Sequence, residues 1–230
     1  MPNIVKNTTF IHPLDLIAPH SCRGCGHMGD ALCDRCKKYI LNLQHNICPI
    51  CKKDNPDGDC HNCPNLPPSF IGGERSGLLG DIVHEYKYNS IRALSIPLAE
   101  LLFHALPTTL SQQNSCIVPL PTISKHIRTR GFDHTLLIAK RLSKLTGFPV
   151  NQLFKRTKNT VQVGADRITR KTQAKNAYQL INKSPNRNYT YILLDDVWTT
   201  GASMQACIEK LRQAGVSHIV LAILSLSRID

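Results

Sequence analysis

The chain has 230 residues, with 28 Lys or Arg, 16 Asp or Glu, and a formal net charge of +12. This length allows one well-cored domain and a small second one, and it excludes a large multidomain assembly. With 42% hydrophobic residues the chain is not of a disordered class. It has neither an apolar run of about eighteen residues nor an apolar signal core, so we expect a cytoplasmic protein that does not span a membrane.

Eight of the ten cysteines form four CxxC pairs within the first 63 residues. Two sulfurs three residues apart can face one point, and two such pairs supply the four thiolates of tetrahedral Zn²⁺. The alternative is a disulfide framework, which requires an oxidising compartment. Crossed pairing of the CxxC motifs is open, but sequential pairing closes shorter loops. Sequential pairing predicts two structural zinc sites, with the ligand sets Cys22, Cys25, Cys33 and Cys36, and Cys48, Cys51, Cys60 and Cys63.

Prolines 64, 67 and 68 follow the last of these cysteines and predict a stiff linker. We therefore expect a zinc-binding module over residues 1–66 and a second domain over residues 69–230.

The second domain alternates helical and strand-like apolar patterns. In chain order these predict helices over 78–88, 98–106, 133–147 and 202–215, and buried strands over 116–121, 149–154, 176–181, 189–194 and 218–226. A long basic loop is expected over 155–175. Asp133 and Gly147 are the expected cap and end of one helix, whose apolar face carries Leu137, Ala139, Leu142 and Leu145. The alternation predicts a parallel α/β sheet with helices on both faces.

The segment richest in chemistry is YILLDDVWTTGAS, residues 191–203. An apolar strand ends in Asp195 and Asp196, and a Thr- and Gly-containing turn leads into a helix, which is where ligands bind in parallel sheets. Backbone amides at residues 200–203 can hold a phosphate, and Gly201 permits a close approach. Two carboxylates would repel a bare phosphate, so they fit sugar hydroxyls or a metal ion. An ordinary capped turn is the alternative, but it needs only one capping residue.

This pattern resembles the phosphoribosyl pyrophosphate (PRPP) motif of type I phosphoribosyltransferases. With the CxxC fingers, a YKY-containing helix, VPLP followed by RTRGFDH, and a basic stretch, the chain resembles the ComF family of competence proteins from about Cys22 to Arg228. The resemblance implies a type I phosphoribosyltransferase-like α/β domain with a parallel sheet, preceded by a small zinc-finger module with four cysteines at each site.

By this resemblance, Asp195 and Asp196 hold the ribose hydroxyls, and Mg²⁺ accompanies PRPP. The 5′-phosphate would be held by Thr199, Thr200, Gly201, Ala202 and Ser203. The loop after Val118–Pro121 would approach the pyrophosphate. Asp133 and His134 stand where the family more often has Asn and Gln. The family's other motifs are matched by Arg128, Arg130, Gly131 and Phe132, and by Gln162, Arg170, Ala177 and Tyr178, with Gln173 in place of its usual Asn.

Residues 121–190 carry fifteen basic and two acidic side chains. A phosphoribosyl donor needs about two or three cations, and the surplus favours a polyanion such as single-stranded DNA. A solvated basic surface is the alternative. Aromatic residues are sparse in this block, so base stacking is not strongly indicated. The candidate DNA-binding residues are Lys125, Arg128, Arg130, Arg156, Lys158, Arg167, Arg170 and Lys171.

Three functions fit this sequence. The first is a DNA-uptake protein of natural transformation that binds PRPP or a related ribose phosphate, handles single-stranded DNA, and works with DNA-uptake or recombination proteins. The second is an active phosphoribosyltransferase with an unidentified acceptor, and the third is a zinc-ribbon binding module whose α/β domain has lost its chemistry. No acceptor-base pocket is recognisable in the sequence, so binding ranks above catalysis and no catalytic residue is assigned.

Overall fold

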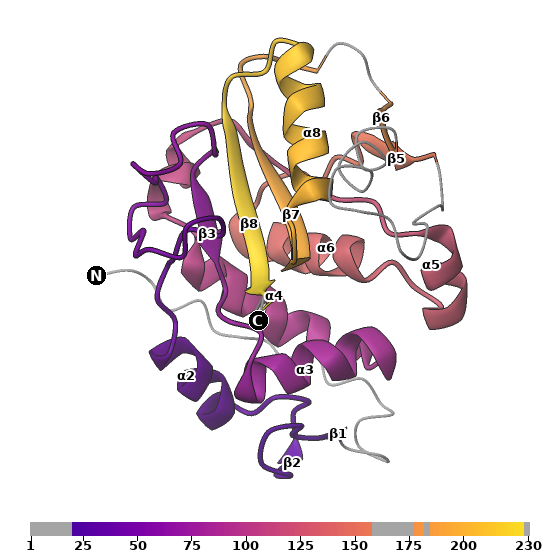
Figure 1. The fold of residues 1–230 in the computed structure, drawn as a ribbon. Coiled ribbons are helices and arrows are strands. Elements are labelled where there is room, and N and C mark those ends of the chain that lie inside the picture. Colours follow the sequence, from indigo (N-terminus) through magenta and orange to yellow (C-terminus); the bar gives the residue numbers. More distant parts are fainter. Residues whose placement is uncertain (1–19, 158–176, 182–184, 228–230) are drawn as a thin grey trace.

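The computed structural model describes residues 20–157, 177–181 and 185–227 (Figure 1). Within these residues the centre is a four-stranded sheet in the order β3–β8–β7–β4. All of its pairings are parallel. Its strands are β3 (Ser69–Ile71), β4 (Ser115–Pro119), β7 (Thr190–Trp198) and β8 (Ile219–Leu226). Every residue of β8 is buried, as expected for a parallel strand covered on both faces.

Helices cover both faces of this sheet. Alternate strand residues face opposite sides, so Ile192 and Leu194 join one hydrophobic cluster while Leu193 joins another. The first cluster is formed with α3 (Gly77–Tyr88), α4 (Ser95–Ala105) and α6 (His134–Thr146), and the second with α8 (Ala202–Gln213). Figure 1 shows α8 in front of the central strands and α4 and α6 behind them. The predicted parallel α/β sheet with helices on both faces is confirmed.

The boundaries of α6 follow its predicted caps, whereas α4 begins three residues before the predicted helix over 98–106. The Asp133 carboxylate accepts a hydrogen bond from the Leu136 amide at 3.1 Å and caps α6. Gly147 ends the same helix with a φ of 77°. The apolar face of α6 differs from the prediction, because it stops before the helix does. Leu142 is buried, whereas Leu145 in the last turn is 41% exposed.

The predicted strand over 149–154 is wrong in extent. Pro149 has no amide to donate, so this segment forms only an isolated parallel bridge between Val150 and Ile117. The strand that follows, β5 (Phe154–Arg156), pairs antiparallel with β6 (Tyr178–Leu180) outside the main sheet. The expected loop over 155–175 therefore begins with a strand, and most of it lies outside the described residues.

Several short elements have no clear sequence pattern. Helix α5 (Ser124–Arg130) has no buried residue, so it shows no apolar period. The remaining elements are β1 (His20–Ser21), β2 (Met28–Gly29), α2 (Asp34–Asn42) and the 3₁₀ helices η1 (Arg92–Leu94) and η2 (Thr108–Gln112).

The first cysteine motif packs directly on the main core. Cys22, Cys36 and Ile40 belong to the same hydrophobic cluster as α3 and α4. The Lys37 ammonium on α2 also lies 2.6 Å from the Glu100 carboxylate on α4. The division into residues 1–66 and 69–230 stays a prediction.

The edge of the sheet at β3 is covered by a side chain from the segment between the cysteine motifs. The Ile71 amide donates to the Asn46 side-chain oxygen at 2.9 Å. The Asn46 side-chain nitrogen donates to the Ser69 carbonyl at 2.8 Å. Gln44 likewise donates to the Gly72 carbonyl at 2.7 Å. These carboxamides satisfy backbone groups that a further strand would otherwise pair.

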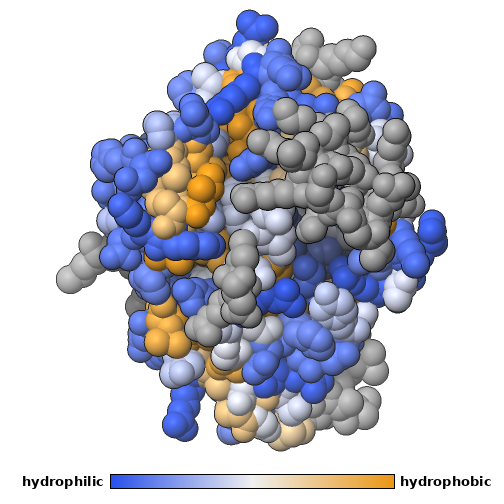
Figure 2. All heavy atoms as spheres, in the orientation of Figure 1, coloured by the Kyte–Doolittle hydropathy of each residue, from blue (hydrophilic) through white to orange (hydrophobic). Residues whose placement is uncertain are grey.

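The surface drawn in Figure 2 is mainly hydrophilic, with small apolar patches separated by polar residues. In the described ranges, no helix combines the length and apolar character needed to cross a bilayer.

Candidate functional site

A cleft of about 200 Å³ lies at the carboxyl ends of β4 and β7, beside the first turn of α8. Its walls come from segments far apart in the sequence: the end of α3, residues 120–123, α5, the start of α6, and the β5–β6 pair. Asp195 and Asp196 both line it. The structure therefore has a cleft where the sequence predicted a ligand crevice.

Asp196 is buried and held by two partners from different helices. Its Oδ2 lies 2.7 Å from Nζ of Lys87 on α3. It also lies 2.7 Å from Nε2 of His134 on α6. Burial alone raises the pKa of the carboxyl, but His134 and Lys87 outweigh burial and hold the pKa well below its usual range. Asp196 is thus ionised at neutral pH and is already paired within the protein.

Asp195 has the opposite environment. Successive strand residues face opposite sides, so Asp195 lies on the α8 side of the sheet. Its Oδ1 accepts a hydrogen bond from the Asp196 amide at 2.9 Å. Burial, and then the charge of Asp196, raise the pKa of Asp195 well above its usual range. The two acids of the motif are therefore chemically distinct, although they are neighbours in sequence.

Arg130 links two histidines at the side of the cleft. Its guanidinium contacts Nδ1 of His134 at 3.0 Å and Nδ1 of His126 at 3.2 Å. Arginine can only donate, so both Nδ1 atoms accept, and Nε2 of His134 carries the hydrogen that faces Asp196. The guanidinium also lies over the Tyr88 ring, 5.6 Å from its centroid. Arg130 is thereby fixed in orientation at the rim of the cleft.

Arg156 and Tyr178 join the β5–β6 pair to the same cleft. The Arg156 guanidinium donates to the Tyr178 hydroxyl at 2.9 Å and lies 5.2 Å from the centroid of its ring. Burial raises the pKa of Tyr178, and it outweighs Ser203, in the first turn of α8, which lies near enough to act on this pKa and lower it. These contacts hold the Arg156 guanidinium beside the turn that leads into α8.

The turn that leads into α8 is shaped by Gly201. Thr199 and Thr200 are exposed, Gly201 is buried, and Ser203 lines the cleft. Gly201 has a φ of 72°. A Cβ at this position would overlap the Trp198 ring. Glycine is thus required here both by backbone conformation and by space.

Replacing Gly201 by alanine is expected to lower the free energy of unfolding by more than backbone strain alone, which costs about 1–3 kcal/mol. Gly147→Ala is the matched control, because Gly147 has a φ of 77° but nothing lies within 4 Å of an added Cβ. Urea denaturation of both variants measures the difference. Equal losses would show that Trp198 moves aside freely.

The candidate DNA-binding residues fall into three groups. Arg130 and Arg156 line the cleft. Lys125 and Arg128 are exposed on α5. Lys158, Arg167, Arg170 and Lys171 lie outside the described residues, as do Gln162 and Gln173.

Sequence reasoning missed the partners of Asp196. Lys87 lies in the YKY segment of a helix, and His134 was noted only as a departure from a family pattern. The three residues are far apart in the chain, so no local spacing reveals them. What the sequence does show is that Lys87 lies in the last turn of one helix and His134 at the start of another.

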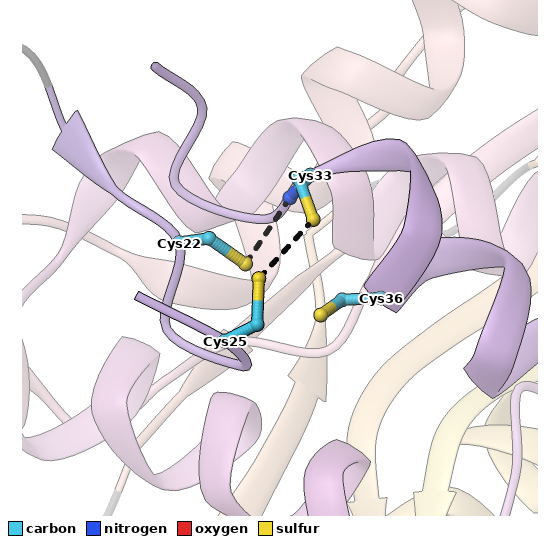
Figure 3. Close-up of side chains that lie close together, drawn as sticks. All are labelled: Cys22, Cys25, Cys33 and Cys36. Carbon is cyan, nitrogen blue, oxygen red and sulfur yellow. Dashed lines mark hydrogen bonds between the residues drawn. The ribbon is translucent and has the colours of Figure 1, made fainter. Parts of the chain in front are cut away.

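The first four-cysteine cluster brings together Cys22, Cys25, Cys33 and Cys36 (Figure 3). Two come from the β1–β2 turn and two from the start of α2, and the sulfurs of Cys25 and Cys33 lie 3.6 Å apart. Thiolates bound to tetrahedral Zn²⁺ at about 2.3 Å are separated by about 3.8 Å. Burial raises the pKa of Cys22, but backbone amides of Cys33, Cys25 and Gly24 outweigh it and lower the pKa to about 6. A thiolate, the form that binds metal, is thus favoured.

The second cluster contains Cys48, Cys51, Cys60 and Cys63. The sulfurs of Cys51 and Cys60 lie 3.4 Å apart. In each cluster the four sulfurs are all within 4.8 Å of one another. Both groupings match the sequential pairing predicted from loop length, and each could hold a tetrahedral metal ion.

The fold and these sites define a parallel α/β protein with a charged cleft at the carboxyl edge of its sheet and two four-cysteine clusters. No protein-family model matches the chain. The chain is 29% identical over 214 residues to competence protein F of Haemophilus influenzae, covering 86% of this chain and 92% of that protein. It is 25% identical to the DNA utilization protein YhgH of Escherichia coli, covering 84% of this chain and 88% of that one.

Competence protein ComFC of Bacillus subtilis is 19% identical over 84% of both chains. The chain is thus similar over most of its length to competence and DNA utilization proteins, in line with the resemblance to the ComF family seen in its motifs.

Solved structures are more distant. An allosteric regulatory enzyme of purine biosynthesis aligns with a TM-score of 0.41 and 15% identity, covering 62% of this chain and 30% of that one. A hypoxanthine phosphoribosyltransferase from Staphylococcus aureus aligns with a TM-score of 0.33 and 13% identity, covering 59% and 62%. Similarity at this level assigns no activity to the chain.

Proposed function

We propose that this protein serves DNA uptake in natural transformation, binding a ribose phosphate such as PRPP in the cleft and single-stranded DNA on the adjoining basic surface. The names of the relatives, which concern competence and DNA utilization, support the biological role. The role places the protein in the cytoplasm, with DNA-uptake or recombination proteins as partners.

The observation that carries the ligand class is the composition of the cleft. It combines the carboxylate of Asp195 with the cations Arg130 and Arg156 and the hydroxyl of Ser203. Carboxylates accept hydrogen bonds from sugar hydroxyls, whereas guanidinium groups bind phosphate. A ribose phosphate is the small molecule that offers both. Asp195, whose pKa is raised in the free protein, would be ionised by a bound Mg²⁺, and the same ion would neutralise pyrophosphate charge when PRPP is bound.

Helix α5 supports the proposal that the protein binds single-stranded DNA. Lys125 and Arg128 are exposed on this helix, which also forms one wall of the cleft through His126 and Arg130. Cations on such a surface bind a phosphate backbone with an affinity that falls steeply as salt is added. We further propose that each four-cysteine cluster holds a structural Zn²⁺, since all four ligand positions are filled by protein.

Titration of Mg²⁺–PRPP and of a single-stranded oligonucleotide, each also used as competitor of the other, tests this proposal. Asp195→Asn is expected to weaken PRPP binding about tenfold or more, as for loss of a charged hydrogen bond. Asp81→Asn, on the exposed side of α3, is the control. Lys125→Glu with Arg128→Glu is expected to weaken DNA binding, whereas Arg35→Glu with Lys38→Glu on α2 is not. Salt-insensitive or absent binding of both ligands would contradict the proposal.

A second candidate is phosphoribosyl transfer from PRPP to an unidentified acceptor. It is favoured by the presence of both motif acids and Ser203 in one cleft. Release of pyrophosphate from Mg²⁺–PRPP with a panel of bases, and its loss in Asp195→Ala with Asp196→Ala, would establish this activity. The absence of release would leave a binding function.

A further inference from the structure

One exposed aromatic residue, Tyr88, lies at the rim of the cleft. Tyr88 is the last residue of α3, its side chain is 58% exposed, and it lines the cleft. The preceding residue, Lys87, turns into the cleft and binds Asp196. Tyr88 therefore lies beside the two acids of the cleft, on its outer side.

The side chains around Tyr88 are cationic and aromatic. The Arg130 guanidinium lies 5.6 Å from the ring centroid of Tyr88, and the ring centroid of His84, one helix turn earlier, lies 4.8 Å from it. Arg130 cannot rotate freely, because it is bound to His126 and His134. Aromatic rings and guanidinium planes are the groups on which unpaired bases stack.

The volume of the cleft also bears on where the base of a bound nucleotide would lie. At about 200 Å³ it is smaller than the pockets of about 300 Å³ or more that enclose a drug-sized ligand. The cleft is about the size of a sugar phosphate and is open to solvent on one side, so a larger ligand extends beyond it. A base attached to a sugar held at Asp195 would then lie at the mouth of the cleft, where the exposed surface next to Lys87 is Tyr88.

We propose that Tyr88, together with the fixed guanidinium of Arg130, is a stacking platform for the base of a nucleotide whose sugar and phosphate lie in the cleft. This inference rests on the proposed ligand class and narrows it from ribose phosphates to nucleotides. Tyr88 lies outside residues 121–190, so the scarcity of aromatic residues in that block does not argue against stacking.

The test compares ligands with and without a base. Wild-type protein is expected to bind adenosine 5′-monophosphate more tightly than ribose 5-phosphate, and a ten-nucleotide oligothymidylate more tightly than an abasic strand of equal length. Tyr88→Leu is expected to reduce the affinity for the base-containing ligands about 5- to 150-fold, the range typical for loss of one stacked base. It should leave the baseless ligands unchanged, and Tyr88→Phe should retain wild-type affinity.

Tyr39→Leu is the matched control, because Tyr39 is 57% exposed but lies on α2, away from the cleft. It should change nothing. If all ligands bind and Tyr88→Leu affects those with and without a base equally, or affects none, the platform is wrong and the proposed function stands. If none of the four ligands binds, the proposed function fails, and the base site fails with it. If Tyr88→Leu weakens only the oligothymidylate or only adenosine 5′-monophosphate, that ligand is the one whose base stacks on Tyr88.

Discussion

With a structural Zn²⁺ in each cluster, as proposed, replacing Cys48 by serine is expected to remove one of the two ions and most of the measurable stability of the chain. A structural zinc site contributes on the order of 10 kcal/mol to folding. This is comparable to the whole free energy of unfolding of a typical domain, about 5–15 kcal/mol. Cys48 is completely buried, so no other side chain can readily take the place of its sulfur. Metal content and urea denaturation measure both effects.

Cys116→Ala is the control for this variant, since Cys116 is a buried thiol on β4 outside both clusters. It should retain two metal ions and lose only the packing of one small side chain. Prolonged treatment of wild-type protein with a strong chelator should reproduce the Cys48→Ser result. Two bound ions and wild-type stability in Cys48→Ser would refute a structural role for the second cluster.

Breaking the buried ion pair under the cleft is expected to have the second largest effect. The Lys87 and Asp196 side chains are only 14% and 6% exposed. Lys87→Met leaves the Asp196 charge buried with His134 as its remaining partner, which should cost about 3–5 kcal/mol of folding free energy. Lys87→Met combined with Asp196→Leu should recover part of this loss, because no unpaired charge remains. A double variant less stable than both single variants would show that the pair is not the cause.

Asp196, with its partners Lys87 and His134, also affects how the free energy of unfolding changes at acidic pH. The folded-state pKa of Asp196 is lowered, so the unfolded chain binds more protons, and stability falls as pH drops below the unfolded value of about 3.9. Asp196→Asn should therefore flatten the loss of stability in this acidic range. Asp195 acts in the opposite sense, because its pKa is raised and its contribution declines as pH rises above about 3.9. Denaturation at several pH values separates the two acids.

Much of the fold follows from local pattern. Asp133 and Gly147 predicted both ends of α6, and continuous apolar runs predicted β4, β7 and β8. Loop length predicted the grouping of the cysteines. These features depend on neighbouring residues, so a single sequence contains them. Helix α5 was missed because it buries no side chain and therefore shows no period.

The site could be predicted only in part. The sequence identifies Asp195 and Asp196 as a pair, because they are adjacent at the end of a strand. It does not show that Lys87 and His134 engage one of them, since these partners come from separate helices. Nor does it show that Tyr88 reaches the rim of the cleft. Such relationships arise from packing of distant elements on the sheet.

The two outer strands of the sheet are both closed to further strand pairing. At β3 the closing group is the Asn46 carboxamide, two residues before Cys48 in the second cluster. At β4 it is a short backbone segment, in which the Pro149 carbonyl accepts from the Ile117 amide at 2.9 Å and the Asn151 amide donates to the Ile117 carbonyl at 2.9 Å. These contacts occupy backbone groups at both edges with which a strand from another chain could otherwise pair. The segment that carries the second cysteine cluster thus also supplies the residue that covers one edge of the sheet.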